Sequence, residues 1–142
     1  MSSKLANLSE ILFRQIHPNH FQDGVPGTDR FKPQPSDDGF MSVDRSTLTS
    51  AGKSHALYTS TGKKSAAVFG VSVGEFQEET LKCLADPLPA NDGKPANPAH
   101  ALVEYTAFND KECKLISKRL WQKAVARKQL HYPGEAQGEA GE

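Results

Sequence analysis

The segment at residues 65–73 constrains the fold of this chain more than any other part of the sequence. Nearly every position in it is small or apolar, including both sets of alternating positions. A strand that is apolar on both faces is usually covered on both sides. We therefore expect a central strand in a sheet with cover on each face. The length of 142 residues fits one domain.

Three further segments, 11–17, 40–43 and 100–107, have strand-like patterns of side chains. Helices are expected from a cap at Asp44 or Ser46 to about Tyr58, from Ser72 or Gly74 to about Leu84, and over about 20 residues after Asn109. These elements predict an α+β fold. We expect a mixed, mostly antiparallel sheet of about four to six strands, with the long C-terminal helix packed across it. Residues 1–132 would form this single domain, followed by a disordered acidic tail at 133–142.

Two proline-rich segments, 18–38 and 86–98, separate these elements. Long irregular segments are uncommon within compact domains, and they often serve as binding loops or lids. For the segment 18–38, the alternative is an ordinary ordered surface loop. The segment 18–38 is therefore a candidate binding loop or lid, and the two segments together motivate the hypothesis of an interaction protein.

The charge balance argues against two classes of partner. The chain has 17 basic and 17 acidic residues, so its net charge favours neither nucleic acid nor a membrane surface. The basic C-terminal helix is better explained as a solvated face, because aromatic platforms for nucleic acid are not evident. The N-terminal residues lack a long apolar run, and we expect a cytoplasmic protein. The two cysteines have no metal-binding spacing, and we expect no metal site.

Arg14 and His17 are the first candidate ligand-binding residues. An arginine on a strand can hold a phosphate or a carboxylate with a forked pair of hydrogen bonds. His17 precedes Pro18, where the chain leaves the strand, and binding residues often occupy such positions. The structural alternatives are an arginine paired with a nearby acid and a histidine that closes a loop.

A second group of candidates follows the strand at 40–43. Ser42 and Arg45 flank a possible helix N-terminus, which can present a hydroxyl and free N–H groups to an anion. Ordinary helix capping explains the same segment without a ligand. On the strand at 100–107, His100 and Glu104 share a face and could line one cleft. Glu104 could act as a general base or stabilise a developing cation.

The order of these residues resembles ADP-ribosyltransferase domains of the Arg/His–Ser–Glu type. Leu12-Phe13-Arg14 resembles the first strand of that family, and Phe40-Met41-Ser42-Val43 the second. A helix with small and aromatic residues, including Tyr58, follows the second strand, and Glu104 stands on a later one. The resemblance implies NAD as a ligand, with Ser42 and Glu104 as catalytic residues. The family's Ser-Thr-Ser run and Glu-x-Glu pair are absent here.

Two hypotheses for function follow. The first is a domain that handles a nucleotide, and it requires Arg14, Ser42 and Glu104 to converge on one cleft. The second is a non-catalytic interaction protein that binds a protein partner within a larger complex. The Arg-x-x-His-Pro start at Arg14–Pro18 and the segment Met41-Ser42-Val43-Asp44 also resemble small bacterial proteins. If those proteins belong to toxin or defence loci, either hypothesis would fit.

Overall fold

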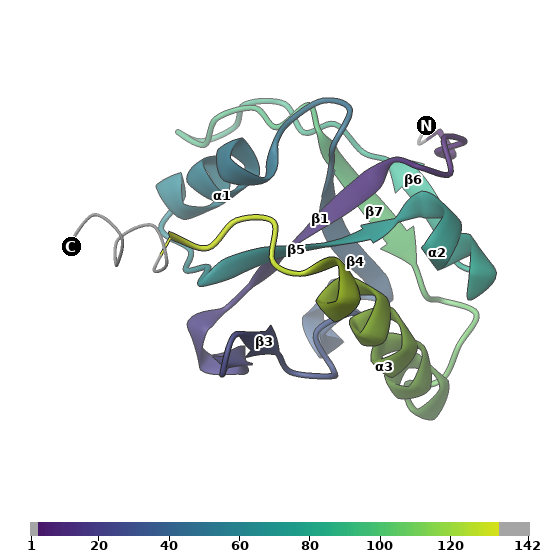
Figure 1. Ribbon diagram of the computed structural model, residues 1–142. Coiled ribbons are helices and arrows are strands. Elements are labelled where there is room, and N and C mark those ends of the chain that lie inside the picture. The colour runs from purple at the N-terminus through teal and green to yellow at the C-terminus, as the bar shows by residue number, and fades with distance from the viewer. Residues whose placement is uncertain (1–2, 134–142) are drawn as a thin grey trace.

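The computed structural model describes residues 3–133 and has an α+β fold (Figure 1). A five-stranded antiparallel sheet has the order β5-β1-β4-β7-β6. Its strands are β1 (Ile11–Ile16), β4 (Phe40–Arg45), β5 (Ala67–Ser72), β6 (Lys82–Ala85) and β7 (His100–Glu104). The helices are α1 (Ala51–Ser60), α2 (Val73–Glu78) and α3 (Asp110–Arg127). Short elements complete the chain: η1 (Pro18–His20), β2 (Phe21–Gln22), β3 (Val25–Pro26) and η2 (Pro35–Asp37).

The two faces of the sheet are covered by different helices (Figure 1). Residues paired across the strands share a face, so the register assigns each side chain to one of them. On one face, apolar side chains from all five strands form the main core, and α3 contributes Ile116, Leu120 and Ala124 to it. On the other face, Gln15 donates a hydrogen bond to Ser54 of α1. The predicted α+β fold, with the C-terminal helix packed on a mostly antiparallel sheet, is therefore confirmed, and every strand pair described in this sheet is antiparallel rather than mixed.

The strand predicted at 65–73 forms β5, and it is buried throughout its length. Its expected central position is wrong, because β5 is the first strand of the sheet. The edge of β5 is covered by the chain beyond α3, where Leu130 N donates to Val68 O and Val68 N donates to His131 O. Gly70 permits this close approach, since a Cβ there would lie 2.6 Å from the Leu130 side chain. The segment beyond α3 thus supplies the cover that this edge strand needs.

Two predicted helices have different bounds in the structure. The first begins at Ala51 after its cap Ser50, and Asp44 and Arg45 lie in β4. Ser46 also caps no helix, because its hydroxyl accepts a hydrogen bond from Ile11 N. The predicted cap at Ser72 is confirmed, but α2 ends at Glu78. Thr80 adopts a positive φ of 59°, and the chain then enters β6, which the sequence did not predict.

The two proline-rich segments are both ordered by hydrogen bonds. The first is tied to α3, because Ser117 Oγ donates to Thr28 O and Trp121 Nε1 donates to Pro26 O. The second forms an irregular hairpin with bridges Leu88↔Asn97 and Asn91↔Lys94. Its tip is Asp92-Gly93, with positive φ at both residues, as a two-residue type I′ turn requires.

The fold thus places two ordered loops beside the sheet. Within residues 3–133, no helix combines the length and the apolar character needed to cross a membrane. The predicted tail at 133–142 lies, apart from Pro133, outside the described residues.

Candidate functional site

A cleft of about 620 Å³ lies where β1 and β4 separate. The ladder between these strands contains only the pairs Leu12↔Arg45 and Phe13↔Asp44. Beyond it, the cleft is bounded by β1 and β4, the end of α1, the loop before η2 and the hairpin at 88–97. The polar and charged residues that line it are Arg14, Gln15, His17, Arg30, Gln34, Asp37, Ser42, Asp44, Tyr58, Thr61, Lys63, Asn91, Lys94, Asn97 and His100.

Arg14 occupies the opening just beyond the last β1–β4 pair. Its Nε donates to Arg30 O at 3.0 Å, and its Nη1 donates to Ser42 O at 3.1 Å. These two carbonyls hold the half-buried guanidinium at the cleft wall. Burial lowers the pKa of Arg14, while the nearby Asp37 and two tyrosines act in the opposite direction. The guanidinium nevertheless stays charged, because arginine is not deprotonated in proteins.

No carboxylate in the described chain forms an ion pair with Arg14. The other four arginines each hold one: Arg30 with Asp29, Arg45 with Glu10, Arg119 with Glu79 and Arg127 with Glu75. Asp37 also lines the cleft, but its carboxylate accepts a hydrogen bond from Gln34 N and forms no ion pair within residues 3–133. Arg14 is therefore a half-buried cation with donor capacity to spare, facing a cleft.

Asp44 is held in one orientation on the cleft floor. Its Oδ2 accepts from Ser54 Oγ at 2.6 Å, and its Oδ1 accepts from Asn97 Nδ2 at 2.9 Å. Ser54 in turn accepts from Gln15 Nε2. This network joins α1, β1, β4 and the hairpin at 88–97 around the cleft. Because both Asp44 oxygens have partners, the carboxylate acts mainly to position the surrounding elements.

His100 presents a ring nitrogen that is able to accept a proton. Its Nδ1 lies 3.0 Å from Asp86 Oδ2 and 3.1 Å from Asp86 O, and both are acceptors. Nδ1 must therefore carry hydrogen, which leaves the lone pair of the neutral imidazole on Nε2. Since His100 lines the cleft, Nε2 can accept a hydrogen bond from a ligand or serve as a base. A carboxylate that orients a histidine in this way is a common arrangement in catalytic sites.

The cleft contains most of the residues proposed from the sequence. Arg14, His17, Ser42, Tyr58 and His100 all line it. Four cleft residues were not predicted from the sequence, because separate loops carry them: Arg30, Lys63, Lys94 and Asn97. The turn at Asp92-Gly93 was a usable signal for the hairpin that brings Lys94 and Asn97 to the cleft.

Arg45 and Glu104 are not among the cleft-lining residues. Arg45 reaches the buried carboxylate of Glu10 instead, with a shortest contact of 3.2 Å. Glu104 pairs with Phe40 at the far end of β4, and its Oε2 accepts from Thr106 Oγ1. The register places Glu104 on the sheet face opposite to Arg14, as it does Ser42 and His100, so Glu104 is separated from the cleft by its position along the strands. Of the three residues expected to converge, only Arg14 and Ser42 line the cleft, and Arg14 contacts the backbone carbonyl of Ser42.

Comparisons with protein-family models, with curated proteins and with solved structures found no match for this chain. Among the residues that the structure describes, no group of three or more His, Cys, Asp or Glu side chains could hold a metal ion. The function must therefore be inferred from the cleft itself.

Proposed function

We propose that the cleft binds a small phosphate-bearing ligand, with Arg14 as its anchor. The observation that carries this proposal is the half-buried guanidinium that lines a cleft without an ion-pair partner in residues 3–133. Taking a cation out of water without compensation is costly. A phosphate would supply that compensation through charge-assisted hydrogen bonds.

The remaining lining fits such a ligand in size and in chemistry. A volume of about 620 Å³ is typical of a small-molecule site. Lys63 and Lys94 add positive charge, and the amides of Asn91 and Asn97 add polar contacts. Tyr58 supplies an aromatic ring at one end. A nucleotide combines phosphate with a ring that can stack, and NAD is the nucleotide that the sequence resemblance implies.

Binding has more geometric support than ADP-ribosyl transfer. The resemblance assigns the catalytic carboxylate to Glu104, and that side chain stands away from the cleft. His100, oriented by Asp86, is the group in the cleft that is best placed to take a proton. Any catalysis at this site would therefore depend on His100 rather than on Glu104.

Calorimetric titration with NAD, ADP-ribose and ATP tests the proposal. We expect at least one of the three to bind, and Arg14→Met to weaken that binding by about tenfold or more, because a charge-assisted contact is lost. Arg119→Met is the matched control, since it removes an exposed arginine that lies on α3 outside the cleft. No heat with any of the three nucleotides, or equal weakening by the two variants, would contradict the proposal.

The alternative function, binding of a protein partner, stays a prediction. The exposed large apolar side chains of the described chain are Leu8, Leu48, Leu88, Leu115 and Leu130, and they come from different parts of the sequence. No observation favours this alternative over the cleft.

A further inference from the structure

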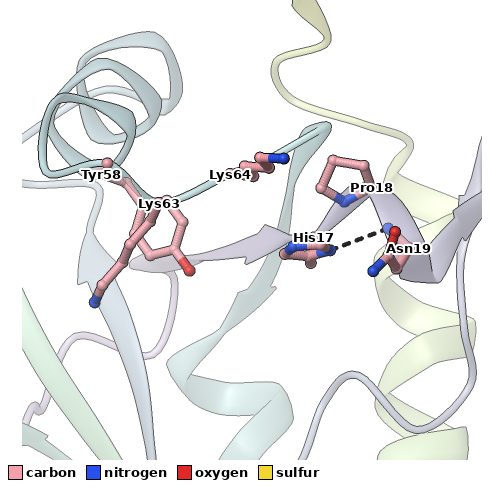
Figure 2. A pocket seen from close by; sticks show the side chains of 7 residues that line it. His17, Pro18, Asn19, Tyr58, Lys63 and Lys64 are labelled. Carbon is pink, nitrogen blue, oxygen red and sulfur yellow. Dashed lines mark hydrogen bonds between the residues drawn. The ribbon is translucent and has the colours of Figure 1, made fainter.

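A second hollow of about 550 Å³ adjoins the cleft at the end of α1 (Figure 2). Its lining residues are His17, Pro18, Asn19, Tyr58, Gly62, Lys63 and Lys64. Three of them, His17, Tyr58 and Lys63, also line the cleft. The two spaces therefore share a boundary, and one ligand can extend from the cleft into the hollow.

The hollow presents positive charge and hydrogen-bond donors. Lys63 and Lys64 are exposed and form no ion pair within the described chain, and none of the lining residues is acidic. His17 Nδ1 accepts from Asn19 N at 3.0 Å, so the neutral ring carries its hydrogen on Nε2. Figure 2 shows His17 facing the space between Tyr58 and Lys64. These groups suit an anion.

Local geometry places Lys63 beside an aromatic ring. Gly62 has a φ of +88°, which turns the chain sharply after α1 and brings Lys63 back towards Tyr58. Lys63 Nζ lies 5.2 Å from the centre of the Tyr58 ring, within the range of a cation–π contact. The ring therefore lies at the boundary between the cleft and a cationic hollow.

We propose that the ligand of this cleft carries two separate anionic groups, one bound by Arg14 and the other by Lys63, Lys64 and His17. This inference rests on the proposed function and specifies its ligand. Arg14 and His17 are three residues apart along an extended chain, which corresponds to about 10 Å. A nucleoside with a phosphate at each end fits this separation better than a pyrophosphate group alone, and its sugar or base would lie against Tyr58.

Paired titrations with adenosine 5′-monophosphate and adenosine 3′,5′-bisphosphate test the inference. We expect the wild-type protein to bind the bisphosphate about tenfold more tightly, as one additional charge-assisted contact would give. The double variant Lys63→Ala/Lys64→Ala should abolish this preference, measured as the ratio of the two affinities, because the second phosphate then loses its cationic partners. Arg14→Met should weaken the binding of both ligands.

The double variant Lys53→Ala/Lys82→Ala is the matched control. Both lysines are exposed and line neither space, so the variant removes the same charge from elsewhere on the protein. We expect it to keep the preference for the bisphosphate. A similar loss in both double variants would indicate a general charge effect and overturn the inference.

The two proposals fail in different ways. If the monophosphate binds through Arg14 but the bisphosphate has no advantage, the second anionic subsite is wrong and the cleft proposal stands. The same conclusion follows if the advantage survives Lys63→Ala/Lys64→Ala. If neither ligand binds the wild-type protein, the cleft proposal is overturned for adenine nucleotides. The two-phosphate inference rests on that proposal and is overturned with it.

Discussion

Arg14 on β1 and Arg45 on β4 lie on neighbouring strands, and both were candidate ligand-binding residues, yet their surroundings differ completely. Arg45 meets Glu10, whose side chain is 1% exposed and which also accepts hydrogen bonds from Thr47 N and Oγ1. Arg14 meets two backbone carbonyls and no carboxylate at ion-pair distance within residues 3–133. The charge of Arg45 is used within the fold, whereas that of Arg14 remains available to a ligand.

The largest effect on stability is expected from breaking the Arg45 pair. Glu10→Ala removes a buried acceptor of several hydrogen bonds and leaves Arg45 without its partner. We expect a loss of about 3 kcal/mol in the free energy of unfolding, measured by urea denaturation. A loss below about 1 kcal/mol would mean that the Arg45–Glu10 pair contributes no more than an ordinary surface pair. The contrast between Arg45 and Arg14 would then be wrong.

The same pair should make stability depend on pH. Burial alone would raise the pKa of Glu10, but hydrogen bonds from Thr47 and Arg45 outweigh it and lower the pKa below the ordinary value of 4.5. The unfolded chain therefore binds this proton first as pH falls. The stabilisation is complete above about pH 4.5 and is lost as pH falls through the lower, folded-state pKa.

Unfolding measured from pH 6 to pH 3 tests this expectation, with Glu10→Gln as the comparison protein. Glutamine keeps the shape of the side chain and cannot ionise. We expect the stability advantage of the wild type over Glu10→Gln to shrink at the acid end of the range. Asp29 and Glu75 also have lowered pKa values, but they are present in both proteins and cancel in the difference. A constant difference across the range would rule out this role for Glu10.

The sequence predicted the strands of this fold better than the ends of its helices. Alternating patterns located four of the five sheet strands, because burial of one or both faces of a strand determines which of its positions are apolar. The segment Asp44-Arg45-Ser46 resembles a helix cap, but tertiary partners hold all three residues elsewhere. Likewise, α2 ends at Glu78 and Thr80 then adopts a positive φ, although no glycine or proline at this point predicts the end of the helix.

The candidate site was predictable only in part, for a related reason. Arg14 and His17 stand out because a strand that carries a cation and an imidazole is unusual. No local pattern distinguishes Arg14 from Arg45, since the difference depends on Glu10, which lies outside both strands. The placement of Lys63 and Asn97 depends on how distant loops meet. The sequence therefore shows which residues could bind a ligand, but it does not show whether another residue of the fold already neutralises their charge.

The stability of the ligand-free Arg14→Met variant tests whether the fold itself depends on Arg14. The substitution removes two hydrogen bonds to carbonyl groups but leaves no carboxylate unpaired, since none is bound there. We therefore expect a loss of only about 1 kcal/mol, measured by urea denaturation without nucleotide. If the loss equals that of Glu10→Ala, Arg14 is a structural residue, and the inference of a ligand-binding arginine is wrong.

Arg119→Gln should have the smallest effect, although its ion pair has the best geometry. Arg119 Nε and Nη2 hold both oxygens of Glu79 at 2.7 to 3.0 Å, closer than Arg45 holds Glu10. However, the Arg119 side chain is 53% exposed, so water already compensates both charges. We expect a change within about 0.5 kcal/mol, measured by urea denaturation and suppressed further by salt. If Arg119→Gln costs as much as Glu10→Ala, contact geometry rather than burial sets the importance of each pair, and the distinction between Arg14 and Arg45 would lose its physical basis.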